Sequence, residues 1–326
     1  MGWEHVWLLD GHRIPEIGYG SWLIGSGSTV VDQVEQALET GFNHLEGGQD
    51  SNCSPARGRC GGTWDRTAQI YRNESEVGDG LKASGLERKD VWVTTKWSGK
   101  DGKGIRASIN ESLEFLKLKY VDLYLIHSPR LAKADPVAAW EEMLVLKKEG
   151  LAHSVGVSNY EIKDLEVLRE AGLATPVVNQ VLLHPYVYDK QKALLAYHEQ
   201  EGIVTEAYSS LYPLTHQSGG PLDKPLRKIA QAHSGEKVAV TEAEVLFAWA
   251  RSKGAVIVTT TRSKERLHAY LRAGDLELTE KEIATIDSAG SQLKAWQRWQ
   301  YAKRAGALVA GCAAAQFVYT AVRAAA

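Results

Sequence analysis

Residues 91–127 contain Val91-Trp92-Val93-Thr94-Thr95-Lys96-Trp97, then an amphipathic stretch over Ile105–Leu116, then Val121-Asp122-Leu123-Tyr124-Leu125-Ile126-His127. The first and last runs are short, apolar and rich in β-branched residues, which is typical of strands buried on both faces of a parallel sheet. The middle stretch repeats its apolar residues at helical spacing. This segment therefore predicts two strands, Val91–Thr95 and Val121–Ile126, joined by one helix.

The same alternation continues in both directions along the chain. Further strands are predicted at Ile17–Gly20, Asn43–Leu45, His153–Val157, Val177–Val181, Ile203–Tyr208 and Val256–Thr259, and further helices at Val30–Thr40, Pro136–Lys148 and Glu161–Ala171. Eight strand–helix repeats with no break in composition favour an α/β protein with one (β/α)8 TIM barrel over residues 1–300. An open doubly wound sheet is the alternative, but the Gly-x-Gly-x-x-Gly turn typical of that fold does not follow the first strand.

Composition limits the function classes. The chain has 326 residues, of which 44% are hydrophobic and 24% charged, and its formal net charge is -2. This balance gives no electrostatic reason to expect nucleic acid as a partner. Three cysteines do not make a disulfide framework, and the N-terminus shows no signal-peptide pattern. We expect a cytoplasmic monomer that acts on a small molecule.

Candidate catalytic residues stand at or beyond strand ends, where barrels carry their chemistry. Tyr71 follows the second strand, Lys96 closes the third and His127 closes the fourth. A phenol is normally too weak an acid to protonate a carbonyl oxygen at neutral pH, but an adjacent ammonium stabilises the phenolate, and a histidine can orient the carbonyl. Singly, each residue is more often structural; together on one barrel mouth they predict a proton-donor site.

Several longer segments resemble one enzyme family. They are Gly41-Phe42-Asn43-His44-Leu45, Thr67-Ala68-Gln69-Ile70-Tyr71-Arg72-Asn73-Glu74, Gly156-Val157-Ser158-Asn159, Asn179-Gln180, His184-Pro185 and Ala207-Tyr208-Ser209-Ser210-Leu211. With residues 46–66 omitted, the chain resembles the aldo-keto reductases from about Gly11 to Gln292. The resemblance implies NADPH-dependent reduction of aldehydes or ketones to alcohols, without a metal.

The resemblance also implies roles for individual residues. Tyr71 would be the general acid, Lys96 would lower its pKa, and His127 would position the carbonyl. Cofactor contacts would come from Ser158, Asn159 and Gln180 on the nicotinamide carboxamide, from Tyr208 stacked on the ring, and from Ser209, Leu211, Thr261 and Arg266. Trp22 and Trp97 would be walls of the substrate pocket, with simple hydrophobic packing as the alternative.

Two departures from the family pattern stand out. Thr260 occupies the place of the lysine that usually binds the adenosine 2′-phosphate, although Thr261 and Arg266 fit and Arg262 or Lys264 can compensate. Since arginine suits a phosphate, NADPH is favoured over NADH. The second departure is the catalytic aspartate, which should directly precede Thr67, where Arg66 stands instead. Glu46 and Asp65 are the candidates to replace it.

Residues 46–66 separate the two halves of this catalytic motif. They contain no Leu, Ile or Val and show no periodicity, which predicts a disordered insertion. We interpret the 21 residues as a replacement of one aspartate, as a short translated intron would produce; an evolved loop is the alternative. Because the aspartate position is disrupted, a catalytically impaired barrel that binds NADPH and acts as a redox-sensing or regulatory partner is an alternative function.

Residues 301–326 form a C-terminal tail beyond the resemblance. Ala305–Val322 is mostly apolar and is bounded by Lys303-Arg304 and Arg323. A helix of this length just reaches across a bilayer. The tail therefore allows a membrane anchor facing the cytosol, or a helix that lies beside the barrel.

Overall fold

The computed structural model describes residues 2–22, 27–47, 49–51, 70–99, 102–236 and 238–302, with the backbone alone for 49–51 and 70–72. Most of the 46–66 insertion and the whole 305–322 segment lie outside the described residues. Among those that are described, no helix is long and apolar enough to cross a membrane.

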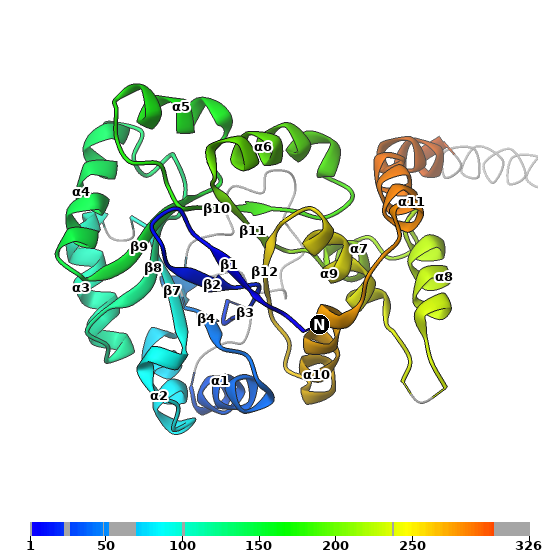
Figure 1. Cartoon of the computed structure of the whole chain (residues 1–326), viewed down its shortest axis with the longest axis horizontal. Helices are drawn as coiled ribbons and strands as arrows, with labels where there is room; N and C mark the ends of the chain where they lie inside the picture. The colour runs from blue at the N-terminus through cyan, green and yellow to red at the C-terminus, as the bar shows by residue number, and fades with distance from the viewer. Residues whose placement is uncertain are drawn as a thin grey trace, which may run out of the picture.

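Eight parallel strands close into a barrel in chain order (Figure 1). They are β3 (Ile17–Gly20), β4 (His44–Glu46), β7 (Trp92–Trp97), β8 (Val121–Ile126), β9 (Ala152–Ser158), β10 (Val178–Leu182), β11 (Val204–Tyr208) and β12 (Val256–Thr259). The predicted TIM barrel is confirmed. Three strands have the predicted bounds, and the other five differ by one or two residues at an end.

Helices surround the barrel, because each βα unit places its helix over the outer face of the sheet (Figure 1). The helices are α1 (Ser28–Thr40), α2 (Glu74–Ala83), α3 (Ile105–Leu116), α4 (Pro136–Lys148), α5 (Ile162–Glu170), α6 (Tyr188–Glu201), α7 (Tyr212–His216), α8 (Asp223–His233), α9 (Glu242–Ser252), α10 (Lys264–Arg272) and α11 (Glu280–Ser291). The main hydrophobic core lies between this layer and the strands.

An N-terminal hairpin lies across one end of the barrel, formed by β1 (His5–Trp7) and β2 (Arg13–Pro15) (Figure 1). Leu8 and Ile14 from this hairpin belong to a second hydrophobic cluster with inward residues of the barrel strands, such as Leu123, Val178 and Val256. The sequence analysis assigned no element before Ile17. A three-residue strand gives too short a pattern to recognise from periodicity.

A short ribbon pairs the start of the insertion with the segment that contains Tyr71. Strand β5 (Gln49–Ser51) pairs antiparallel with β6 (Ile70–Arg72), outside the barrel. Residues 49–51 were expected to lack regular structure, so β5 is a difference from the sequence analysis. Its consequence is that residues 49–51 are joined to residues 70–72 close to the end of β4.

Candidate active site

Lys96 and Glu46 form a buried ion pair at the carboxyl ends of neighbouring strands. Lys96 lies on β7 and Glu46 is the last residue of β4, and the Lys96 Nζ lies 2.6 Å from the Glu46 Oε1. Both side chains are 5% exposed. Attraction between the charges offsets part of the large desolvation cost of each ion, and it fixes the ammonium at this mouth. Of the two candidates for the missing aspartate, Glu46 therefore contacts Lys96, while Asp65 lies outside the described residues.

Gln180 extends this pair across the barrel interior. Its Nε2 donates one hydrogen bond to the Glu46 Oε2 and another, of 2.6 Å, to the Glu206 Oε2. Gln180 lies on β10 and Glu206 lies beside it on β11, in register. The Glu46 carboxylate thus connects Lys96 to Gln180.

The sequence analysis missed Glu206. Its side chain is fully buried, and burial together with the negative charge of Glu46 raises the pKa of Glu206 to about 8. The missed signal was an acidic residue in the middle of the predicted strand Ile203–Tyr208. Periodicity alone does not give the register between strands, so Glu206 and Gln180 could not be paired from sequence.

His127 directly follows β8, and its backbone N–H donates to the Trp97 carbonyl at 3.1 Å. Burial, with a further contribution from the Lys96 ammonium, lowers the pKa of His127 to about 3. The imidazole is therefore neutral at physiological pH. A neutral imidazole can donate one hydrogen bond to a carbonyl oxygen without supplying a full proton.

Tyr71 is the middle residue of β6, and its side chain lies outside the description. Its neighbourhood is fixed by Asn73, two residues later. The Asn73 Nδ2 donates to the Ser21 carbonyl at 2.8 Å, and the Ser21 N–H donates to the Glu46 carbonyl at 2.9 Å. Because two residues span at most about 7 Å, the Tyr71 backbone is held close to the end of β4. The position of its hydroxyl relative to Lys96 stays a prediction.

Three of the predicted cofactor residues are joined in one hydrogen-bond chain. The Tyr208 hydroxyl donates to the Asn159 Oδ1 at 2.9 Å, and the Asn159 Nδ2 donates to the Ser158 Oγ at 3.0 Å. The Ser158 Oγ in turn donates to the backbone carbonyl of Gln180 at 2.9 Å. Burial raises the pKa of Tyr208 to about 12, so this phenol is not the acid of the site. The structure therefore brings Ser158, Asn159, Gln180 and Tyr208 together beside the Lys96–Glu46 pair.

The remaining cofactor candidates lie in the segments after β11 and β12. Ser209 has a positive φ of 57°, and Leu211 precedes α7. Thr261 is buried, and its carbonyl accepts the Tyr19 hydroxyl at 3.1 Å. Arg266 lies in the first turn of α10, where its backbone N–H donates to the Ser263 Oγ. These residues lie in the segments that follow the adjacent strands β11 and β12.

The two tryptophans have different environments. Trp22 is half-buried, and its ring packs so closely on Gly20 that a Cβ there would lie 2.1 Å from it. Trp97 is 8% exposed, belongs to the main hydrophobic core, and donates its indole N–H to the Lys103 carbonyl. Both sets of contacts agree with the packing alternative, and a role as pocket walls stays a prediction.

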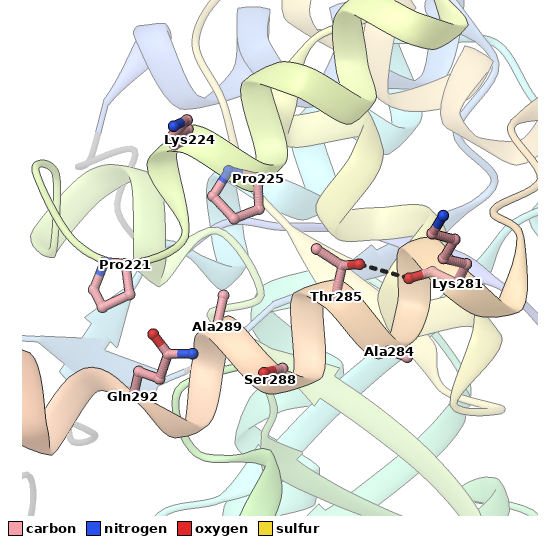
Figure 2. A pocket seen from close by; sticks show the side chains of 9 residues that line it. All are labelled: Pro221, Lys224, Pro225, Lys281, Ala284, Thr285, Ser288, Ala289 and Gln292. Atoms are coloured by element: carbon pink, nitrogen blue, oxygen red, sulfur yellow. Dashed lines mark hydrogen bonds between the residues drawn. The ribbon is translucent and has the colours of Figure 1, made fainter.

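A separate groove of about 560 Å³ lies between α8 and α11 (Figure 2). Its lining consists of Pro221, Lys224, Pro225, Lys281, Ala284, Thr285, Ser288, Ala289 and Gln292. None of the candidate site residues lines it. Elsewhere in the described structure, no group of three His, Cys, Asp or Glu residues could hold a metal ion.

Comparison with known proteins places this chain in a family. The model of the Aldo/keto reductase family matches residues 16–291. The chain is 34% identical over 267 residues to the NAD/NADP-dependent indole-3-acetaldehyde reductase of Schizosaccharomyces pombe, covering 81% of this chain and 85% of that protein. It is 33% identical over 280 residues to the methylglyoxal reductase DkgA of Salmonella typhimurium, covering 86% and 90%.

A solved structure gives the same result. The aldo/keto reductase from Brucella melitensis superposes with a TM-score of 0.73 at 31% identity, over 88% of this chain and 99% of that one. Sequence and structure thus point to the same group, and the predicted resemblance is confirmed. The chain belongs to the aldo-keto reductase family and is an oxidoreductase of the carbonyl-reducing type.

Proposed function

We propose that the protein reduces a small aldehyde or ketone to the alcohol with NADPH, and that Tyr71 is the general acid. The observation that carries the proposal is the buried Lys96–Glu46 pair, with the neutral His127 on the adjoining strand end. A fixed ammonium beside a phenol and a neutral hydrogen-bond donor is what carbonyl protonation requires.

When bound, NADPH supplies a hydride to the carbonyl carbon. The protein's own residues act on the carbonyl oxygen. His127 orients this oxygen by donating a hydrogen bond, and the O–H bond of Tyr71 breaks as its proton is transferred to the oxygen. Lys96 stabilises the resulting phenolate, and Glu46 keeps the ammonium in place. Solvent then returns a proton to Tyr71, which restores the site.

The described residues fit a nicotinamide cofactor. Ser158, Asn159 and Gln180 gather polar atoms at one side of the mouth, as a carboxamide requires. Ser210 offers a further group, because its buried Oγ has no hydrogen-bond partner in the part of the chain that the structure describes. Ser210 follows β11, next to the predicted cofactor residues Ser209 and Leu211.

NADPH is the cofactor that the segment after β12 supports. Arg266 lies in the first turn of the nine-residue α10, where the helix dipole also favours an anion. Thr260 replaces a lysine, however, and the relative from Schizosaccharomyces pombe is named as using NAD or NADP. We therefore expect both cofactors to bind, with NADPH about tenfold tighter. Competing fluorescence titrations measure this, and tighter NADH binding would overturn the assignment.

The activity is tested by following NADPH oxidation with methylglyoxal, the substrate named for a relative, and with 4-nitrobenzaldehyde as a generic aromatic aldehyde. Turnover in the wild type that is lost in Tyr71→Phe supports the proposal. Phenylalanine keeps the ring and removes only the acidic proton, so unchanged turnover in this variant would exclude Tyr71 as the acid.

The alternative of an impaired regulatory barrel depended on the missing aspartate. Glu46 supplies a carboxylate to Lys96, so this support for the alternative is weakened. We further propose a cytoplasmic monomer. Size-exclusion chromatography and cell fractionation test these two points, and recovery of the full chain in the membrane fraction would favour the predicted tail anchor.

A further inference from the structure

Two buried carboxyl groups share one amide nitrogen inside the barrel. The Gln180 Nε2 donates to the Oε2 of both Glu206, on the neighbouring strand β11, and Glu46, on β4 at the opposite side of the closed barrel. Glu46 is the carboxylate of the ion pair with Lys96 and offers only acceptors, so the Gln180 atom that contacts it must be the nitrogen. The orientation of this amide follows from its partners.

This arrangement uses both N–H groups of Gln180. Its carbonyl oxygen is then the one polar atom of the side-chain amide left to meet a ligand. An acceptor in this place selects a ligand that donates, such as the NH₂ of a nicotinamide carboxamide. Without one of the two carboxyl groups, the amide could turn and present its nitrogen instead.

We infer that Glu206 is a positioning residue: with Glu46 it locks the Gln180 amide so that its carbonyl oxygen accepts from the cofactor carboxamide. The inference rests on the proposed function, since it assigns Glu206 to cofactor recognition in that site. The inference also connects the catalytic residues to the cofactor residues, because Glu46 binds Lys96 with one oxygen and Gln180 with the other.

The burial of Glu206 argues against a purely architectural role. The side chain has 0% exposure, and its Oε1 finds no hydrogen-bond partner among the described residues. Burying a carboxyl group with one oxygen unpaired is unfavourable, whereas an apolar side chain at this position would carry no such cost. A residue that lowers the stability of the fold is expected where the active site depends on the position of its side chain.

Burial, and after it the negative charge of Glu46, raises the pKa of Glu206 and keeps it protonated, while the Gln180 hydrogen bond and the Lys96 ammonium act in the other direction. Glu46 and His44 face Glu206 from β4, with the His44 Nε2 3.8 Å from its Oε1; Lys96 faces it from β7 and Gln180 from β10. Strand β12, on its other side, reads Val256-Ile257-Val258-Thr259 and adds no titratable group. With the pKa of Glu206 near 8 and that of His44 lowered to about 3 by burial, Glu206 is neutral at pH 7.

The decisive experiment compares two ligands that differ in one group. NADP⁺ carries the carboxamide, and its 3-acetylpyridine analogue has a methyl ketone there and no N–H donor. Dissociation constants from protein-fluorescence quenching are measured at pH 7 for the wild type, Glu206→Leu and Glu206→Gln. Glu244→Gln is the matched control, because Glu244 is also a buried acid (3% exposed) but lies on α9 in the helix layer.

We expect the wild type to bind NADP⁺ about tenfold more tightly than the analogue, as one hydrogen bond to a buried amide predicts. In Glu206→Leu, NADP⁺ should bind about tenfold more weakly while the analogue changes less than about twofold, so that discrimination is lost. Glu206→Gln keeps an acceptor for Gln180 and should retain most of the discrimination between the two ligands. Glu244→Gln should discriminate as the wild type does. If Glu206→Leu does not fold, Glu206→Met takes its place.

Three results would overturn the inference. One is undiminished discrimination in Glu206→Leu, and another is an equal loss of affinity for both ligands, which would indicate general damage. In either case, wild-type NADPH oxidation with methylglyoxal leaves the proposed function standing. If the wild type binds neither ligand and oxidises no NADPH, the proposed function and this inference fail together.

Discussion

The two ends of the barrel interior contrast in chemistry. At the end covered by the hairpin, Leu8 and Ile14 pack with apolar strand residues such as Val178 and Val256. At the other end the interior holds two carboxyl groups, an amide and an ammonium. The same parallel strands supply both layers. Burial of the apolar side chains stabilises the folded state. Burial of the charged and polar groups at the other end is unfavourable, but it holds the charges in fixed orientations.

The largest effect should come from the polar end. Lys96→Met is expected to lower kcat/KM about a thousandfold, since Tyr71 loses the charge that makes it an acid. Steady-state NADPH oxidation measures this, and Lys147→Met is the control, because the Lys147 amine pairs with Asp10, near the hairpin. The double variant Lys96→Met/Glu46→Gln removes both charges, so that no unpaired charge stays buried. It should be as inactive as Lys96→Met. Near-normal activity of this double variant would show that the ion pair has no part in the mechanism.

The hairpin end should affect stability instead. Ile14→Ala removes a side chain with 0% exposure and is expected to lower the free energy of unfolding by about 3 kcal/mol. Urea unfolding measures it. Below the unfolding transition, kcat/KM should stay within about twofold of the wild type. A large fall in kcat/KM of the folded variant would mean that the two ends are not independent.

A pH dependence of stability should come from Glu206. Its pKa is about 8 in the folded protein and ordinary, near 4.5, in the unfolded chain. As the pH rises above 4.5 the unfolded state ionises and the folded state does not, so the folded state is progressively destabilised until about pH 8. Glu206→Gln should therefore be roughly 2 kcal/mol more stable at pH 7 and gain nothing below pH 4.5. A pH-independent difference would contradict a buried neutral acid.

The smallest effect is expected from removal of the insertion. A chain with residues 46–66 replaced by one aspartate restores the family's pattern, yet Glu46 already contacts Lys96. We expect kcat/KM of the two chains to agree within about threefold, by the same NADPH assay. A gain of a hundredfold would mean that Glu46 is misplaced by about 1 Å or more. Intact residues 46–66 in the dominant transcript would refute the translated-intron interpretation.

The sequence was sufficient for the barrel and for much of the site. The bounds of α3 and α4 were predicted without error, because long amphipathic stretches have a strong 3.6-residue period. Lys96 and His127 could be placed at strand ends because each follows a short apolar run rich in β-branched residues. The hairpin and β5 were not predicted, because three-residue strands leave no period to detect.

The identity of the residues fixed which chemistry is available to this protein: a phenol, an ammonium, a histidine and a carboxylate near strand ends. The tertiary structure decided which of them meet. It selected Glu46 as the partner of Lys96, 50 positions away in the sequence, and brought Glu206 beside Gln180, 26 positions away. The physical reason is that a closed sheet turns every second side chain inward, so distances between strands depend on register and closure, which no local pattern encodes.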